Sequence, residues 1–223
     1  MNSRSVLLRL FVLAVVPGAL AGQDVAKQLD RRVPPAVRQA VVTIAADAAA
    51  RGLPVEPLVE KAIEGGAKGV PADRVIAAVR VLAGRLGDAM GALRAAGVAA
   101  PSADVVEGGA DALNAGLTSG DVRDLVRVSR PPYEPSLTLR VAATLVALGV
   151  PPEQALRLVN AMITAGRSPG DLLTLPAEVQ AGVGRGATPG QAAAGLARAA
   201  AAGRPPVPPG QAKTGKPANP HRP

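Results

Sequence analysis

The sequence contains no cysteine and no tryptophan, and it has one histidine, one phenylalanine and one tyrosine among 223 residues. The absence of cysteine excludes disulfide bonds, thiolate nucleophiles and cysteine-bearing metal sites. The single histidine, His221, stands close to the last residue, so a catalytic triad or a two-histidine zinc site has no imidazole within a folded region. The scarcity of aromatic rings weighs against single-stranded nucleic acid, which is usually held on stacked aromatic side chains. We therefore expect no cofactor, no metal ion and no specific nucleic-acid partner.

Residues 1–21 have the organisation of a secretory signal peptide. Two arginines precede the short apolar run 10–16, and Ala19 and Ala21 form a small-x-small cleavage pattern. The apolar run is shorter than the roughly 20 residues that a helix needs to cross a bilayer. We expect cleavage after Ala21, export to a periplasm or to the outside of the cell, and no membrane span in the mature chain.

The stretch 203–223 is rich in proline and carries positive charge without any acidic residue. Such a composition offers little apolar surface to bury and predicts a disordered tail. Its basic residues could make weak, salt-sensitive contacts with a polyanion, and they are Arg204, Lys213, Lys216 and Arg222. The whole chain has a formal net charge of +8, but most of the excess lies in this tail and in the leader. The segment 22–202 is nearly balanced, which weakens the suggestion of nucleic-acid binding that a basic chain gives.

The segment 22–202 is predicted to be an all-α domain of short antiparallel helices, arranged as a bundle or a repeat-like stack. It lacks the alternating pattern of strands, and its apolar residues recur at helical intervals. One turn motif recurs: a glycine that ends a helix, an apolar residue, and then proline, serine or threonine at the start of the next helix. This motif occurs at Gly52, Gly69, Gly116 and Gly149, with looser copies at Gly166 and Gly186. The predicted helices are 35–51, 54–67, 71–96, 102–114, 119–129, 135–148, 151–165, 169–174, 176–184 and 189–202, with a possible short helix at 24–31.

Two of these predicted helices have distinct patterns. The long helix 71–96 carries an apolar stripe, and its Gly84, Gly87 and Gly91 suggest close approach of a neighbouring helix. The segment 137–148 is apolar on nearly all sides, so we expect it at the centre of its lobe.

A tandem duplication is also suggested by the glycine spacing. Gly52 and Gly69 are 17 residues apart, as are Gly149 and Gly166, although any chain of short helices reuses the same turn residues. If the domain has two lobes, the proline-rich loop 130–135 is the predicted seam between them.

Few residues form a pattern that could carry chemistry. Glu56, Glu60 and Glu64 share one helical face at four-residue steps and could pair as acid and base or ligate a hard cation. A solvated, ion-paired face is the favoured interpretation of this row, as it is for Asp121 and Asp124 with their neighbouring arginines.

Two glycine-rich segments resemble nucleotide-binding loops but lack their context. The segment 210–217 ends in Pro217 where a phosphate-binding loop needs serine or threonine, and no strand precedes it. The segment 182–186 follows no strand either, and a helix end is the favoured interpretation.

The favoured functional hypothesis is therefore an exported, non-enzymatic helical protein that acts through protein–protein contacts or as a structural component of the envelope. One alternative is an envelope or extracellular polyanion binder that uses the basic tail. The other alternative is a carboxylate-based hydrolase that uses Glu56, Glu60 and Glu64.

Overall fold

The computed structural model describes residues 18–203, with side chains from Gln23 onward. Within this range the fold is all-α: it has ten helices and no strand. The fold class predicted from the sequence is therefore confirmed. Most of the predicted signal peptide lies outside the described residues, and so does the basic tail with Arg204, Lys213, Lys216 and Arg222. Within residues 18–203, no helix combines the length and the apolar composition needed to cross a bilayer.

The chain divides into two compact units, 1–79 and 80–223, at a boundary that falls within the long helix α4. The described part of the first unit contains α1 (Gly18–Leu29), α2 (Pro35–Ala50), α3 (Glu56–Ala67) and the first turns of α4 (Ala72–Ala95). The helices α1, α2 and α3 all contact one another. Their shared core consists of aliphatic side chains with almost no exposure, among them Leu29, Val37, Val41 and Leu58.

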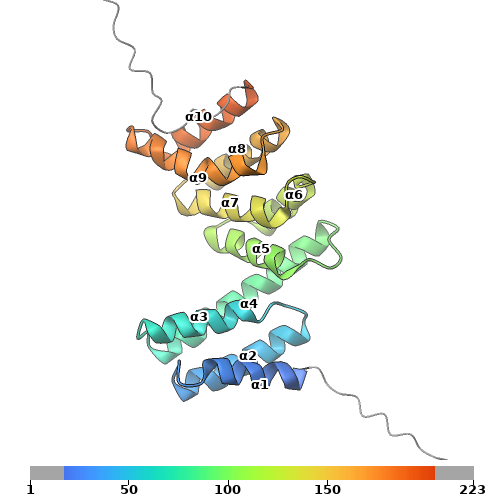
Figure 1. Ribbon diagram of the computed structural model, residues 1–223, viewed down its shortest axis with the longest axis vertical. Helices are drawn as coiled ribbons and strands as arrows, with labels where there is room; N and C mark the ends of the chain where they lie inside the picture. Colours follow the sequence, from blue (N-terminus) through green and yellow to red (C-terminus); the bar gives the residue numbers. More distant parts are fainter. Residues whose placement is uncertain (1–17, 204–223) are drawn as a thin grey trace, which may run out of the picture. The chain divides into compact units, whose positions relative to one another are not determined.

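The second unit contains the remainder of α4 and six further helices, drawn in green to red in Figure 1. These are α5 (Ala103–Ala115), α6 (Ser119–Val128), α7 (Pro135–Ala147), α8 (Pro152–Thr164), α9 (Pro169–Gly184) and α10 (Pro189–Ala201). Each helix packs on the next but one: α5 on α7, α7 on α9, α6 on α8, and α8 on α10. The unit is thus a stack of helix pairs in which α5, α7 and α9 form one row and α6, α8 and α10 form the other.

The helix α7 occupies the centre of this stack, as its nearly uniform apolar sequence predicts. It contacts α5, α6, α8 and α9, and its Leu139, Ala142 and Leu145 are fully buried. One polar side chain of α7, Thr138, is equally buried. Its hydroxyl lies 2.6 Å from that of Ser129 and donates to the carbonyl of Pro135 at 3.0 Å, so no hydroxyl is left without a partner in this core.

The predicted helix ends are confirmed by the backbone. All six marker glycines have a positive φ between 63° and 111°, the conformation that glycine adopts without a steric penalty. At Gly116, for example, the N–H of Leu117 donates to the carbonyl of Ala112, which closes the helix end. Side-chain caps begin the following helices in three cases, at Thr118, Ser168 and Thr188, each in a reciprocal capping box.

Two details differ from the sequence-based expectations. The segments 169–174 and 176–184 form one helix, α9, which contains Pro176 in its interior. Proline removes only one backbone hydrogen-bond donor, and buried residues before and after Pro176 hold the helix in place. Apart from the adjoining residues and the backbone of α4 itself, no heavy atom lies within 4 Å of a Cβ atom added at Gly84 or Gly91, so neither glycine serves a close helix approach. The division of the chain into compact units falls between Val79 and Arg80, and the loop 130–135 belongs to the second unit, within which a seam at this loop stays a prediction.

Candidate functional site

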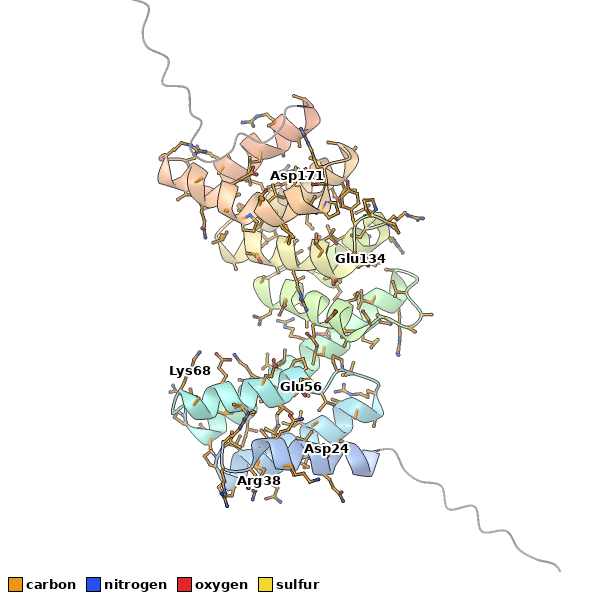
Figure 2. All side chains as sticks on the ribbon, in the orientation of Figure 1. Asp24, Arg38, Glu56, Lys68, Glu134 and Asp171 are labelled. Atoms are coloured by element: carbon orange, nitrogen blue, oxygen red, sulfur yellow. The ribbon has the colours of Figure 1, made fainter. Side chains whose placement is uncertain are left out.

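The row of glutamates predicted as a possible acidic site lies on α3. Glu56, Glu60 and Glu64 are all exposed, and Figure 2 shows Glu56 and Lys68 at opposite ends of the helix region. The Glu64 carboxylate accepts hydrogen bonds from Lys68 and, at 2.9 Å, from Lys61. These hydrogen bonds and the charges of both lysines lower the pKa of Glu64 to about 2. The row is therefore a solvated face with an ionised, paired carboxylate, which gives the hydrolase hypothesis no positive support.

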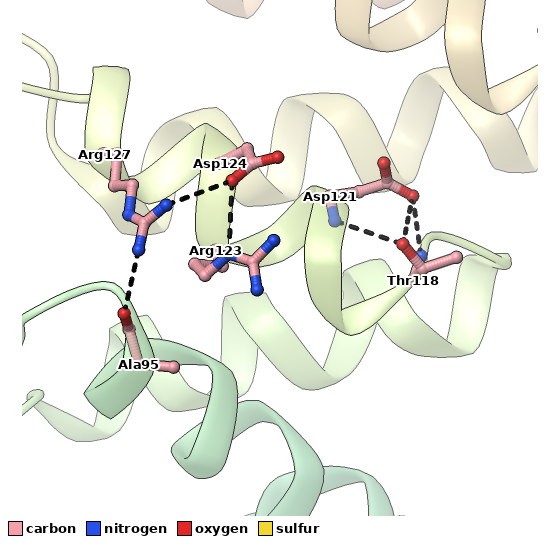
Figure 3. A network of polar contacts seen from close by, with 6 residues as sticks. All are labelled: Ala95, Thr118, Asp121, Arg123, Asp124 and Arg127. Atoms are coloured by element: carbon pink, nitrogen blue, oxygen red, sulfur yellow. Dashed lines mark hydrogen bonds and ion pairs between the residues drawn. The ribbon is translucent and has the colours of Figure 1, made fainter.

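The acidic pair on α6 has a structural role. Asp121 accepts from the backbone N–H and hydroxyl of Thr118, both at 2.8 Å, and so forms the capping box of α6 (Figure 3). Asp124 lies 3.2 Å from the Arg123 guanidinium and 3.6 Å from that of Arg127. Arg127 also donates to the carbonyl of Ala95 at the end of α4. The network fixes the start of α6 and ties its last turn to α4.

The remaining sequence-based candidates contribute no site in the described part of the chain. Between residues 23 and 203, no three histidine, cysteine, aspartate or glutamate side chains are grouped so as to hold a metal ion. The segment 182–186 is a helix end, as predicted, with Gly186 at a φ of 95°. The phosphate-loop-like segment 210–217 and the four basic residues of the tail lie outside the described residues, so the polyanion hypothesis stays a prediction.

The described structure instead shows a groove on each side of α7, where this helix lies between α5 and α9. The hollow between α5 and α7 has a volume of about 610 Å³, and the hollow between α7 and α9 one of about 380 Å³. Both hollows are lined by Arg140 and Thr144, which form the exposed ridge between them. We call the two hollows together the α7 groove. The side that faces α5 is lined by Asp111, Asn114, Ala115, Ala143 and Ala147, and the side that faces α9 by Ser136, Leu137, Val141, Leu173 and Pro176.

Small residues position the α5 side of the α7 groove. A Cβ atom at Gly108 would lie 3.2 Å from the Ser136 carbonyl oxygen and 3.4 Å from the Cβ of Leu139. The absence of a side chain at Gly108 therefore lets the backbone of α5 approach α7 closely. This close contact aligns the exposed face of α5 with that of α7, which places Asp111 and Arg140 in the same hollow.

The charged side chains of the groove differ in how many ionic partners they have. The Arg140 guanidinium lies 4.0 Å from the Asp104 carboxylate and 3.6 Å from that of Glu107, both on α5. Asp111, one turn further along α5, has a raised pKa because partial desolvation outweighs the attraction of Arg140. Within the described residues, Asp111 forms no hydrogen bond and no ion pair of its own.

This groove was not predicted from the sequence, and neither Arg140 nor Asp111 was identified there as a site residue. A usable signal exists, since Asp104, Glu107, Asp111 and Asn114 recur at helical steps of three and four and so share one face of α5. That signal does not say which helix lies opposite, which depends on contacts distant in sequence.

A comparison of this chain with protein-family models, with curated proteins and with solved structures found no match.

Proposed function

We propose that the chain is an exported helical protein that acts through contact with another protein, and that the α7 groove is the contact surface. The observation that carries this proposal is the exposed apolar side chain Leu173, which lines the groove with 62% of its surface exposed. Leu173 does not stand alone, because Leu137, Val141 and Pro176 line the same hollow, and a recessed apolar patch rimmed by polar groups is typical of a site that another molecule covers. A partner side chain that packed against Leu173 would bury apolar surface and gain free energy.

The architecture supports a binding role. Stacked helix pairs present the same face of successive helices along one side, and such rows commonly bind other chains. In the second unit this row is α5, α7 and α9, and both hollows of the α7 groove open on it. The groove also contains hydroxyl, amide and charged groups, which can orient a partner once apolar contact is made.

Export is part of the same proposal. Cleavage after Ala21 would remove the first residues of α1, while Val25 and Leu29, which are buried in the described part of this helix, lie beyond that point. These two packing contacts would therefore be retained after processing. Intact-mass measurement of the protein purified from its native cells should give a chain that begins at Gly22, and a chain that keeps residues 1–21 would contradict export by this route.

Site-specific photo-cross-linking tests the contact surface. A photoreactive amino acid at position 173 should give a discrete cross-linked species in the native envelope fraction, because the groove is the proposed contact. The same substitution at Val183, an exposed valine of the same helix that lines neither hollow, is the matched control and should give no such species. The 173 cross-link should also disappear when Leu137 is changed to aspartate.

Equal cross-linking from positions 173 and 183, or a cross-link at 173 that survives Leu137→Asp, would contradict the proposal. Circular dichroism of each variant distinguishes a lost contact from a lost fold.

A further inference from the structure

The two sides of the α7 groove differ in chemistry. The α9 side is dominated by Leu137, Val141, Leu173 and Pro176, and the single charged residue that lines it is Arg140. The α5 side is lined by Asp111 and Asn114 together with three alanines and the same Arg140 and Thr144. A molecule lying across the ridge of α7 would thus contact an apolar surface on one side and a carboxylate on the other.

Acidic side chains of α5 gather around Arg140 on this side of the groove. They are Asp104, Glu107 and Asp111. Arg140 contacts the first two at 4.0 Å and 3.6 Å, so its charge is already shared. The Asp111 carboxylate is partly desolvated and unpaired within the described residues, and a cation brought from outside would be attracted to it.

The dimensions of the groove suit one short segment. Packed helices lie about 8–10 Å apart, so the hollows on the two sides of α7 are separated by a similar distance. Two residues four apart on a helix have Cβ atoms about 6 Å from each other, and a lysine side chain extends several ångströms further. A leucine and a lysine at this spacing can therefore occupy both hollows at once.

We propose that the α7 groove binds a segment of a partner protein that carries an apolar side chain next to a lysine or arginine. The apolar side chain packs against Leu173 in the hollow between α7 and α9. The cation pairs with Asp111 in the hollow between α5 and α7. This inference rests on the proposed function, because it specifies the partner of the same groove.

Three labelled helical peptides test the proposal directly. They share one sequence with a leucine, and the residue four positions later is lysine, glutamine or glutamate. Fluorescence anisotropy at low ionic strength should show the lysine peptide binding the full-length protein about tenfold more tightly than the glutamate peptide, which is the scale of a partly exposed charge contact. Raising the ionic strength should reduce this preference.

Two variants give changes of opposite sign. Asp111→Asn should remove most of the preference for lysine, because it removes the carboxylate that the cation contacts. Arg140→Gln should strengthen lysine binding several-fold, because it removes the cation that competes for the Asp111 carboxylate. The matched control is Asp88→Asn, which changes the same charge at an exposed position of α4 outside the groove and should leave the preference intact.

The outcomes separate this inference from the proposed function. Equal binding of the lysine and glutamate peptides, or equal effects of Asp111→Asn and Asp88→Asn, would overturn the partner chemistry, while loss of binding in Leu173→Asp would still support the groove as a contact surface. Binding that survives Leu173→Asp would contradict the groove itself. Absence of binding by the lysine peptide at millimolar concentration would overturn the partner chemistry, while a specific photo-cross-link from position 173 would still support the groove as a contact surface.

Discussion

The tetrapeptide Glu-Gly-Gly-Ala occurs twice in the chain, at 64–67 in α3 and at 107–110 in α5, and its two copies have different surroundings. Glu64 pairs with two lysines of the same helix and its neighbourhood, whereas Glu107 lies 3.6 Å from an arginine of α7. The first pair follows from spacing along one helix, and the second follows from the packing of two helices. The same local sequence thus gives a self-contained surface in one unit and one wall of a groove in the other.

The glycines of the two copies also meet different neighbours. A Cβ atom at Gly66 would lie 2.6 Å from the backbone carbonyl oxygen of Arg32, whereas one at Gly109 would lie 3.0 Å from the Cβ of Ala89. A backbone atom yields only if the chain moves, while a methyl group in a helix interface can shift by a few tenths of an ångström. The difference predicts that the two copies respond unequally to the same substitution.

The largest effect is expected from Gly66→Ala in the first copy. The added methyl group would overlap the Arg32 carbonyl and should destabilise the protein by about 2–3 kcal/mol, the upper part of the range for overpacking. Urea unfolding followed by circular dichroism measures the loss. Gly84→Ala is the matched control in α4, where nothing lies within 4 Å of the added group, and it should stabilise the protein by up to about 1 kcal/mol through helix propensity. Two changes of the same sign would contradict the close approach at Gly66.

A smaller effect is expected from Gly109→Ala in the second copy. The contact with Ala89 should cost about 1 kcal/mol, part of which the better helix propensity of alanine offsets. A double-mutant cycle with Ala89→Gly isolates the contact, because removing the methyl of Ala89 should restore the space. The cycle should show a favourable coupling between the two substitutions. Strictly additive effects would mean that the helices adjust to the new methyl without cost.

The difference between the two copies also marks how far the sequence alone could lead. Turn glycines such as Gly116 and Gly149 and the cap at Thr118 act on residues next to them in the chain, so the helix ends were predictable. The apolar run 137–148 predicted the central helix for a similar reason, since a helix without a polar face must be surrounded. The pairing of Glu64 with Lys68 was equally predictable, because Lys68 directly follows the last residue of the same helix, four positions after Glu64.

The groove was not predictable by the same means. The groove forms because α5 packs directly on α7, although α6 lies between these two helices in the sequence. This packing brings Asp111 and Arg140, which are distant in the sequence, to the same hollow. Pro176 presented a related difficulty: proline usually ends a helix, yet the buried Leu172, Leu175 and Val179 keep α9 continuous around it. In both cases the structure depends on contacts between helices, which the local sequence pattern does not reveal.

A third prediction uses pH to compare the two acidic groups. The pKa of Asp111 is raised in the folded protein, so its ionised form destabilises the fold above that pKa, and this cost disappears as the pH falls through it. Asp111→Asn should therefore stabilise the protein at neutral pH, by about 0.5 kcal/mol or less because the side chain is exposed. The gain should shrink toward pH 3, where wild-type Asp111 is protonated in both states. Urea unfolding at several pH values measures it, and a loss of stability at neutral pH would contradict the sign.

The smallest effect, of opposite sign, is expected from Glu64→Gln. The pKa of Glu64 is lowered from 4.5 to about 2 in the folded protein, so its contribution to stability is present above pH 4.5 and is lost as the pH falls toward 2. The stability of the variant should therefore not show this part of the decrease between pH 4.5 and pH 2. At pH 7 the variant should be nearly as stable as the wild type, because water and salt screen an exposed ion pair. NMR titration of the Glu64 carboxyl carbon checks the premise at low ionic strength, and 0.5 M salt should move its pKa back toward the ordinary value. A titration midpoint near 4.5 at low salt would mean that Lys61 and Lys68 do not pair with the Glu64 carboxylate when the protein is in solution. Of the two acidic groups, only Asp111 would then have a shifted pKa.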